Sequence, residues 1–293
     1  MKDTLIAFCD LAFCPVSYDF VTWLVRAMYA QRARHCKRLH VVLVPKEDGL
    51  GGFARSWGKH DAAAARWRLW HIAVASCPLA GATVTVTATR AQAEAMRQEP
   101  CWWPEGRAHL AGWMIEHARA GGFVPKLQPT AAAVRYAQSA WQHEKIVTLT
   151  MRSQETDESR NSDMDAALAM CGWLREKGYH PIGIADTHEV LMKGGAGAVA
   201  LSPDLRLALY QRAAMNLIGN NGPAVLLWHS IAPFLQFNVA LPAAEWKAHY
   251  EEHLSLRPGD QLPWARPDQR LIYRPDSFDV MREEFERWAG ATS

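Results

Sequence analysis

A polar turn between two apolar segments is the first place in the chain where residue types suggest chemistry. The turn reads GNNGP over residues 219–223 and follows the apolar run from Met215 to Ile218. Its two glycines allow a sharp bend and close approach of the backbone to a ligand. Backbone N–H groups at such a turn, with the N-terminus of a following helix, favour anions. We therefore predict that Asn220, Asn221 and Gly222 contact a phosphate or a sugar, although the same residues also form an ordinary turn.

Two other polar stretches follow apolar segments in the same half of the chain. RSQETDESRN, residues 152–161, comes after the segment 146–151, and Asp186 ends the segment 181–185. Parallel strands present their carboxyl ends at one edge of a sheet, where ligands bind. Arginine neutralises the charge of a diphosphate, whereas an exposed ion pair with a nearby acid is the alternative role. The predicted donor- or diphosphate-binding residues in these stretches are Arg152, Arg160, Asn161 and Asp186, of which Asp186 is expected to contact the base or the ribose.

Two carboxylates near the N-terminus are the candidates for a general base. Asp10 ends the predicted strand 4–9, and Asp19 lies nine residues later, where a helix begins. A base that accepts a proton from a hydroxyl group must be placed across the site from the leaving group. An acidic residue in the first turn of a helix also interacts favourably with the helix dipole, which is the structural alternative for Asp19.

Alternating apolar segments organise these residues. In the first half, strands are predicted at 4–9, 39–44 and 83–89, with helices starting at Ser17 and spanning 61–75, 90–97 and 109–119. In the second half, strands are predicted at 146–151, 181–185 and 215–218 and before residue 237, with helices at 130–143, 163–177 and 277–288 and from residue 203. The order predicts an α/β protein with two doubly wound parallel sheets facing across a cleft. The segment 121–129, rich in Gly and Pro, divides domains 1–125 and 126–293.

Composition excludes several classes of protein. The chain of 293 residues has 32 Lys and Arg against 30 Asp and Glu, so no single-signed field indicates nucleic-acid binding. Its six cysteines form no C-x-x-C pair, and the N-terminus does not read as a signal peptide, which predicts the reducing cytoplasm. No apolar run spans a bilayer, so the chain is expected to be soluble and at most peripheral to a membrane. The adjacent Trp102 and Trp103 suggest a hydrophobic plug more than a sugar platform.

The order of motifs in the second half resembles the donor-binding half of GT-B glycosyltransferases. The arginine-bearing loop in VTLTMRSQETDESRNSD is similar to the fucosyltransferase-like group, and NLIGNNGPAVLLWHSIAPFLQF is similar to heptosyltransferase-like enzymes. The sequences LIAFCDLAFCPVSYDF and RLHVVLVPKEDG look like the front of bacterial surface-polysaccharide proteins. This chain has Thr150 where the fucosyltransferase pattern has His, and only Arg152 matches that pattern. It has Asn220 and Asn221 where heptosyltransferases usually have Asp and Ser or Thr.

The resemblance implies two Rossmann-like domains of GT-B type, with an N-terminal acceptor side and a C-terminal donor side. It implies metal-independent transfer of a sugar from a nucleotide-diphosphate donor to a glycan or surface-polysaccharide acceptor, without a further cofactor. Three roles for Arg152, Arg160 and the 219–223 turn stay open: glycosyl transfer, epimerisation or hydrolysis of a sugar nucleotide, and binding without turnover. The oligomeric state is not indicated.

A metal site is the remaining alternative. His249-Tyr250-Glu251-Glu252-His253 matches the H-x-x-E-H pattern of a zinc protease on a plausible helix. The segment ends soon afterwards at Pro258-Gly259, and the third ligand would have to come from the C-terminal helix. A solvated polar helix explains the run without metal, and we regard the protease as the weaker interpretation.

Overall fold

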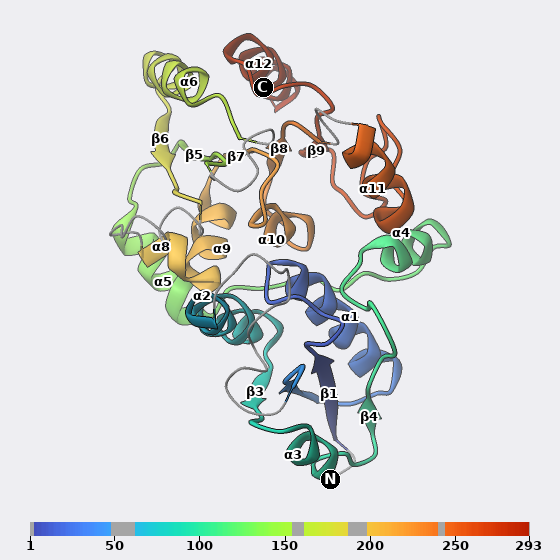
Figure 1. Cartoon of the computed structure of the whole chain (residues 1–293). Coiled ribbons are helices and arrows are strands. Elements are labelled where there is room, and N and C mark those ends of the chain that lie inside the picture. The colour runs from blue at the N-terminus through green and yellow to red at the C-terminus, as the bar shows by residue number, and fades with distance from the viewer. Residues whose placement is uncertain (1–2, 48–61, 154–160, 187–197, 240–243, 293) are drawn as a thin grey trace.

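Two parallel β-sheets organise the chain in the computed structural model, which describes residues 3–47, 62–153, 161–186, 198–239 and 244–292 (Figure 1). The first sheet has the order β3-β2-β1-β4, and the second has the order β6-β5-β7-β8-β9. Every strand pair in both sheets is parallel. The strands are β1 (Thr4–Asp10), β2 (Arg38–Val44), β3 (Thr83–Val86), β4 (Cys101–Trp102), β5 (Ile146–Thr150), β6 (His180–Gly183), β7 (Met215–Ile218), β8 (Phe234–Gln236) and β9 (Gln269–Leu271).

Helices alternate with these strands. The first half contains α1 (Asp19–Ala33), α2 (Ala62–Arg68), a π-helical turn (Leu69–Val74), a 3₁₀ turn (Cys77–Ala80), α3 (Arg90–Ala95) and α4 (Gly112–Arg119). The second half contains α5 (Ala131–Ala140), α6 (Met164–Glu176), α8 (Ala198–Leu201), α9 (Pro203–Arg212), α10 (Ala224–Trp228), α11 (Ala244–Leu254) and α12 (Phe278–Thr292). The predicted α/β class with two parallel sheets is confirmed. Among the described residues, no helix is both long and apolar enough to span a bilayer.

The long strands form where the sequence is apolar on both faces. Residues 41–44 of β2 and 7–10 of β1 are all buried, as expected for a parallel sheet covered by helices on both sides. In β4, Cys101 packs with Phe8 on one face of the sheet, whereas Trp102 packs beside Trp23 of α1 on the other face. β4 and β9 were not predicted, because two or three residues show no measurable periodicity.

Helix starts follow capping side chains. The Thr130, Asp163 and Ser202 side chains each accept a hydrogen bond from a backbone N–H in the first turn of α5, α6 and α9. The helical run predicted after the 219–223 turn is only five residues long, since α10 ends at Trp228. Ser230 there bonds its own neighbours, donating to the Leu227 carbonyl and accepting from the Ala232 N–H, and Pro233 follows. The dipole of so short a helix contributes little to anion binding.

α1 and α10 connect the two halves. A buried hydrogen bond of 3.3 Å joins Thr22 of α1 to His229, the residue that follows α10. The segment between α4 and α5 runs beside the same contact, where the Leu127 N–H donates to the His229 carbonyl over 2.7 Å. One hydrophobic core cluster continues from Leu5 in the first sheet to Leu271 in the second. The predicted division at residues 125/126 lies in this connecting segment and stays a prediction.

Candidate functional site

The carboxyl edge of the second sheet gathers the predicted diphosphate-binding residues. Arg152 follows β5 and is buried. Its backbone N–H donates to Ser162 Oγ over 3.0 Å, and the Ser162 N–H donates back to the Arg152 carbonyl over 2.9 Å. These two bonds close the loop that carries Asn161, which is half-exposed. Arg160 lies outside the described residues.

The 219–223 turn is held against this loop. A Cβ on Gly219 would lie 2.5 Å from Ser162 Oγ, so only glycine fits at this contact. Asn221 Nδ2 donates to the Thr150 carbonyl over 3.0 Å, and Asn220 Nδ2 donates to the Asn238 carbonyl over 3.1 Å. The asparagine side chains therefore fix the turn. Within the described part of the chain, no hydrogen bond is made by the Gly222 N–H.

Asp186 follows β6 at the same edge and is buried. Its negative charge acts to raise the pKa of two arginines, Arg68 and Arg206. Burial lowers the pKa of Arg68 in α2, and Tyr18, Asp186 and Asp19 partly oppose this effect. Burial also lowers the pKa of Arg206 in α9, but Tyr210, Tyr18 and Asp186 raise it to above its usual value. Residues of both halves therefore form one electrostatic cluster.

Asp10 is engaged by Arg90 at the carboxyl edge of the first sheet. Arg90 Nη1 donates to Asp10 Oδ1 over 2.9 Å, and Nη2 donates to Oδ2 over 2.5 Å. The Ala12 N–H also donates to Oδ1 over 3.0 Å. Both carboxylate oxygens therefore accept charge-assisted hydrogen bonds from the guanidinium of Arg90. This contact joins residues 80 positions apart and was not foreseen from the sequence.

Asp19 lies where the two halves meet. It is half-buried in the first turn of α1, and its carboxylate accepts a hydrogen bond of 2.8 Å from Ser17 Oγ. The preceding residue, Tyr18, contacts the 219–223 turn, since a Cβ on Gly222 would lie 3.0 Å from the Tyr18 ring. Burial lowers the pKa of the nearby His109, and the charge of Asp19 acts in the opposite direction. Of the two predicted carboxylates, Asp19 is the one placed beside the second sheet.

Three polar residues of this region were missed in the sequence. Arg68 and Arg206 belong to the cluster around Asp186, and Asp276 follows β9 at the same edge. Arg206 is fully buried, and its Nη2 donates to the carbonyls of Ala185 and Ala200. Its position as the single charge within the apolar run LRLALY was a usable signal. Asp276 Oδ2 is buried without a hydrogen-bond partner among the described residues.

The H-x-x-E-H segment falls in α11, but the side chain of His249 lies outside the described part of the molecule. Among the described residues, no three His, Cys, Asp or Glu side chains cluster closely enough to hold a metal ion. The expectation of a metal-independent site stays a prediction.

No protein-family profile matches the sequence, and no curated protein sequence matches it. Solved structures do match. ADP-heptose LPS heptosyltransferase II of E. coli aligns over 100% of both chains, with 10% identity and a TM-score of 0.52. E. coli heptosyltransferase WaaC with ADP aligns over 97% of this chain and 99% of its own, with 12% identity and a TM-score of 0.46. A glycosyl transferase family 9 protein of Veillonella parvula covers 80% of this chain and 81% of its own, with 10% identity and a TM-score of 0.43.

The match to heptosyltransferase II extends over the whole chain and defines the fold. Two parallel α/β halves follow one another in the GT-B arrangement. The fold predicted from the order of motifs is therefore confirmed.

Proposed function

We propose that the chain is a metal-independent glycosyltransferase that moves a sugar from a nucleotide-diphosphate donor to a glycan acceptor of a surface polysaccharide. One observation carries the proposal. Arg152 and the 219–223 turn, which follow adjacent strands, are joined through Ser162 and Thr150 into one rigid edge beside α1 of the other half. In open α/β sheets this edge is where phosphorylated ligands bind.

The leaving diphosphate needs positive charge, which the arginine of this edge supplies. Arg152 bears the charge, and the Gly222 N–H adds a neutral donor. Asp186 and Asp276 at the same edge are suited to accept hydrogen bonds from hydroxyl groups of the nucleoside or the sugar. These roles follow from position at the edge and the chemistry of each side chain.

Asp19 is the better candidate for the base that deprotonates the acceptor hydroxyl. Asp10 shares both oxygens with Arg90, whereas the carboxylate of Asp19 is half-exposed beside the donor edge. A carboxylate that can accept a proton from an acceptor hydroxyl contributes to inverting transfer by general-base catalysis. The structural similarity to ADP-heptose LPS heptosyltransferase II makes an ADP-linked sugar the first donor to test.

A thermal-shift screen with ADP, GDP, UDP and CMP tests the donor site, because a ligand that binds only the folded chain raises its apparent stability. Arg152→Ala is expected to weaken binding of the preferred diphosphate about 10- to 100-fold, the equivalent of a charged hydrogen bond. Arg135→Ala, at an exposed position on α5, is the matched control. Calorimetry that gave equal affinities for the two variants and the unaltered chain would remove Arg152 from the site.

Turnover of nucleotide sugars separates the related chemistries. A transferase consumes the donor in proportion to glycosylated acceptor. Release of free sugar without an acceptor identifies a hydrolase, and conversion of the sugar nucleotide alone identifies an epimerase. Binding without turnover in any of these assays contradicts the enzymatic proposal.

A further inference from the structure

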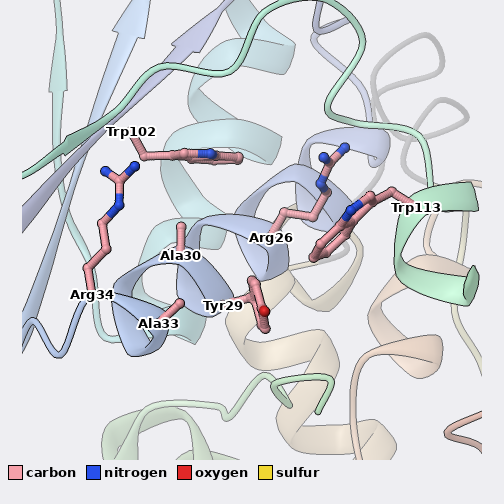
Figure 2. Close-up of a pocket in the computed structure, with 7 residues that line it drawn as sticks. All are labelled: Arg26, Tyr29, Ala30, Ala33, Arg34, Trp102 and Trp113. Atoms are coloured by element: carbon pink, nitrogen blue, oxygen red, sulfur yellow. The ribbon is translucent and has the colours of Figure 1, made fainter. Parts of the chain in front are cut away.

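A pocket on the first half lies away from the donor edge, along the side of α1. Its volume is about 340 Å³, and its lining includes Arg26, Tyr29, Ala30, Arg34, Trp102 and Trp113. We call it the α1–α4 pocket. Figure 2 shows the Trp102 ring over Ala30, with Arg34 beside it and with Arg26 and Trp113 at the other end. The volume is near the lower end of the roughly 300–1,000 Å³ typical of small-molecule sites.

The walls of the pocket are aromatic and fixed in place. Trp113 stacks on His117 with a centroid distance of 4.9 Å and meets Tyr29 edge-on at 5.3 Å. Trp102 is held beside Trp23 at 5.5 Å. The floor is formed in part by Ala30, whose short side chain leaves space above the helix. Rigid aromatic faces around an open floor suit a compact ring-shaped ligand.

The pocket is positively charged at both ends. Arg26 is in α1 and Arg34 directly follows its last residue, eight positions later, which places them about 12 Å apart along the helix axis. Neither side chain makes an ion pair within the described residues, and no acidic residue lines the pocket. Arg26 Nη1 donates to the Ala108 carbonyl over 2.8 Å, and its guanidinium lies over the Trp113 ring at 4.9 Å. Arg26 Nε is buried without a hydrogen-bond partner among the described residues.

A half-buried cation without a counter-charge is costly unless a ligand supplies the charge. We propose that the α1–α4 pocket binds an anionic sugar residue, a monosaccharide unit that bears a carboxylate or a phosphate, as part of the acceptor. This inference deepens the proposed function: the claim that the sugar is part of an acceptor rests on the chain being a glycosyltransferase. The aromatic faces hold the sugar ring, and the arginines bind its anionic group. A recessed pocket with two cations fits one compact ligand, whereas a lipid surface requires a broad cationic face.

Fluorine NMR of the whole chain labelled with 5-fluorotryptophan tests this proposal. Trp102→Phe and Trp113→Phe assign the two resonances. Glucuronic acid and glucose 1-phosphate are expected to shift both, and they distinguish a carboxylate from a phosphate as the anionic group. Glucose and inorganic phosphate at equal concentration are expected to shift neither. Equal shifts with glucose, shifts with inorganic phosphate alone, or no shifts with either acidic sugar would overturn the proposal.

Arg34→Gln is expected to weaken binding of the acidic sugar about tenfold, the equivalent of one charged hydrogen bond. Arg32→Gln is the matched control, because Arg32 lies on the same helix but stacks on Phe123 at 4.6 Å, and it should bind as tightly as the unaltered chain. If Arg34→Gln instead abolishes sedimentation with anionic phospholipid vesicles and leaves the sugar titration unchanged, the pocket belongs to a membrane contact and the proposal is wrong.

The two proposals fail separately. Arg152→Ala is expected to lose nucleotide-diphosphate affinity and to keep the acidic-sugar titration. Arg34→Gln is expected to do the reverse. A chain that binds acidic sugars in the α1–α4 pocket but no nucleotide diphosphate retains the site and refutes the glycosyltransferase.

Discussion

The carboxyl edges of the two sheets hold their charges in different ways. At the edge of the first sheet, Asp10 and Arg90 neutralise each other through two hydrogen bonds, so the charges are satisfied within the protein. At the edge of the second sheet, the asparagine and serine side chains bond to backbone groups. These neutral side chains hold the loops against the backbone of the sheet edge. The second edge is the one that we propose for the charged ligand.

The sharpest test of this difference compares the two carboxylates. If the Asp10–Arg90 pair is structural and Asp19 is the base, Asp19→Asn is expected to lower kcat by about 10²- to 10⁴-fold, the contribution of general-base catalysis. Asp10→Asn is expected to lower the melting temperature instead, with a much smaller effect on kcat in the molecules that remain folded. Steady-state kinetics and thermal unfolding of both variants measure this. A larger loss of kcat in Asp10→Asn would reverse the assignment.

The contact between the two halves should depend on pH. Burial lowers the pKa of His229 from its ordinary value of 6.5 to about 3, and the charge of Lys126 adds to the effect. The unfolded chain therefore binds a proton between pH 6.5 and 3 that the folded chain does not, so stability falls as the pH falls through this window. Across the whole window, the loss of stability contributed by His229 is on the order of 5 kcal/mol.

His229→Gln is expected to flatten this dependence in urea unfolding measured from pH 7 to pH 4. His35→Gln, at an exposed position just after α1, serves as the control and should retain the slope of the unaltered chain. An unchanged slope in His229→Gln would show that the acid sensitivity arises elsewhere.

The smallest expected effect separates the scaffold of the second sheet from its ligand edge. The buried Glu284 accepts hydrogen bonds from Arg270, Arg274 and Arg287 at 2.9, 3.3 and 2.6 Å. Glu284→Gln is expected to lower the free energy of unfolding by about 2 kcal/mol, because three arginines lose their shared anion. Nucleotide affinity below the unfolding temperature should not change. Glu283→Gln, with a side chain 48% exposed, is expected to cost less than about 1 kcal/mol. Equal losses in the two variants would contradict this account.

Local signals in the sequence predicted much of the fold. The apolar run LHVVLV defined β2, and the side chain of Asp163 together with Gly178 bounded α6. Those features act between near neighbours. β4 and β9 escaped prediction because their pairing partners, not their own few residues, determine them. The end of α10 could not be predicted either, because it depends on hydrogen bonds of Ser230 and not on the pattern of apolar residues.

Only those parts of the candidate site that follow from the order of strands along the chain could be predicted from the sequence. Parallel strands bring their carboxyl ends together, so Arg152, Asp186 and the 219–223 turn could be grouped from the sequence. Contacts across long separations could not. Arg90, which binds Asp10, lies 80 residues from it in the sequence. Although burial lowers the pKa of Arg68 in the first half, the charge of Asp186 in the second half acts in the opposite direction. Trp102 and Trp103 also differ, since Trp103 stacks on Phe8 at 4.5 Å and Trp102 lines the α1–α4 pocket.

α1 sets a fixed distance between the proposed base and the α1–α4 pocket. Asp19 is in its first turn, and Arg26 is seven residues later, about 10 Å farther along the axis. Because the rise per residue of an α-helix is fixed, the distance between Asp19 and Arg26 sets the length of ligand that can reach both. An acceptor whose acidic unit rests at Arg26 must extend back along the helix to present its hydroxyl group near Asp19. If the chain is the proposed glycosyltransferase, it should therefore select acceptors by the number of sugars between the acidic unit and the reacting end, and a single sugar should be too short.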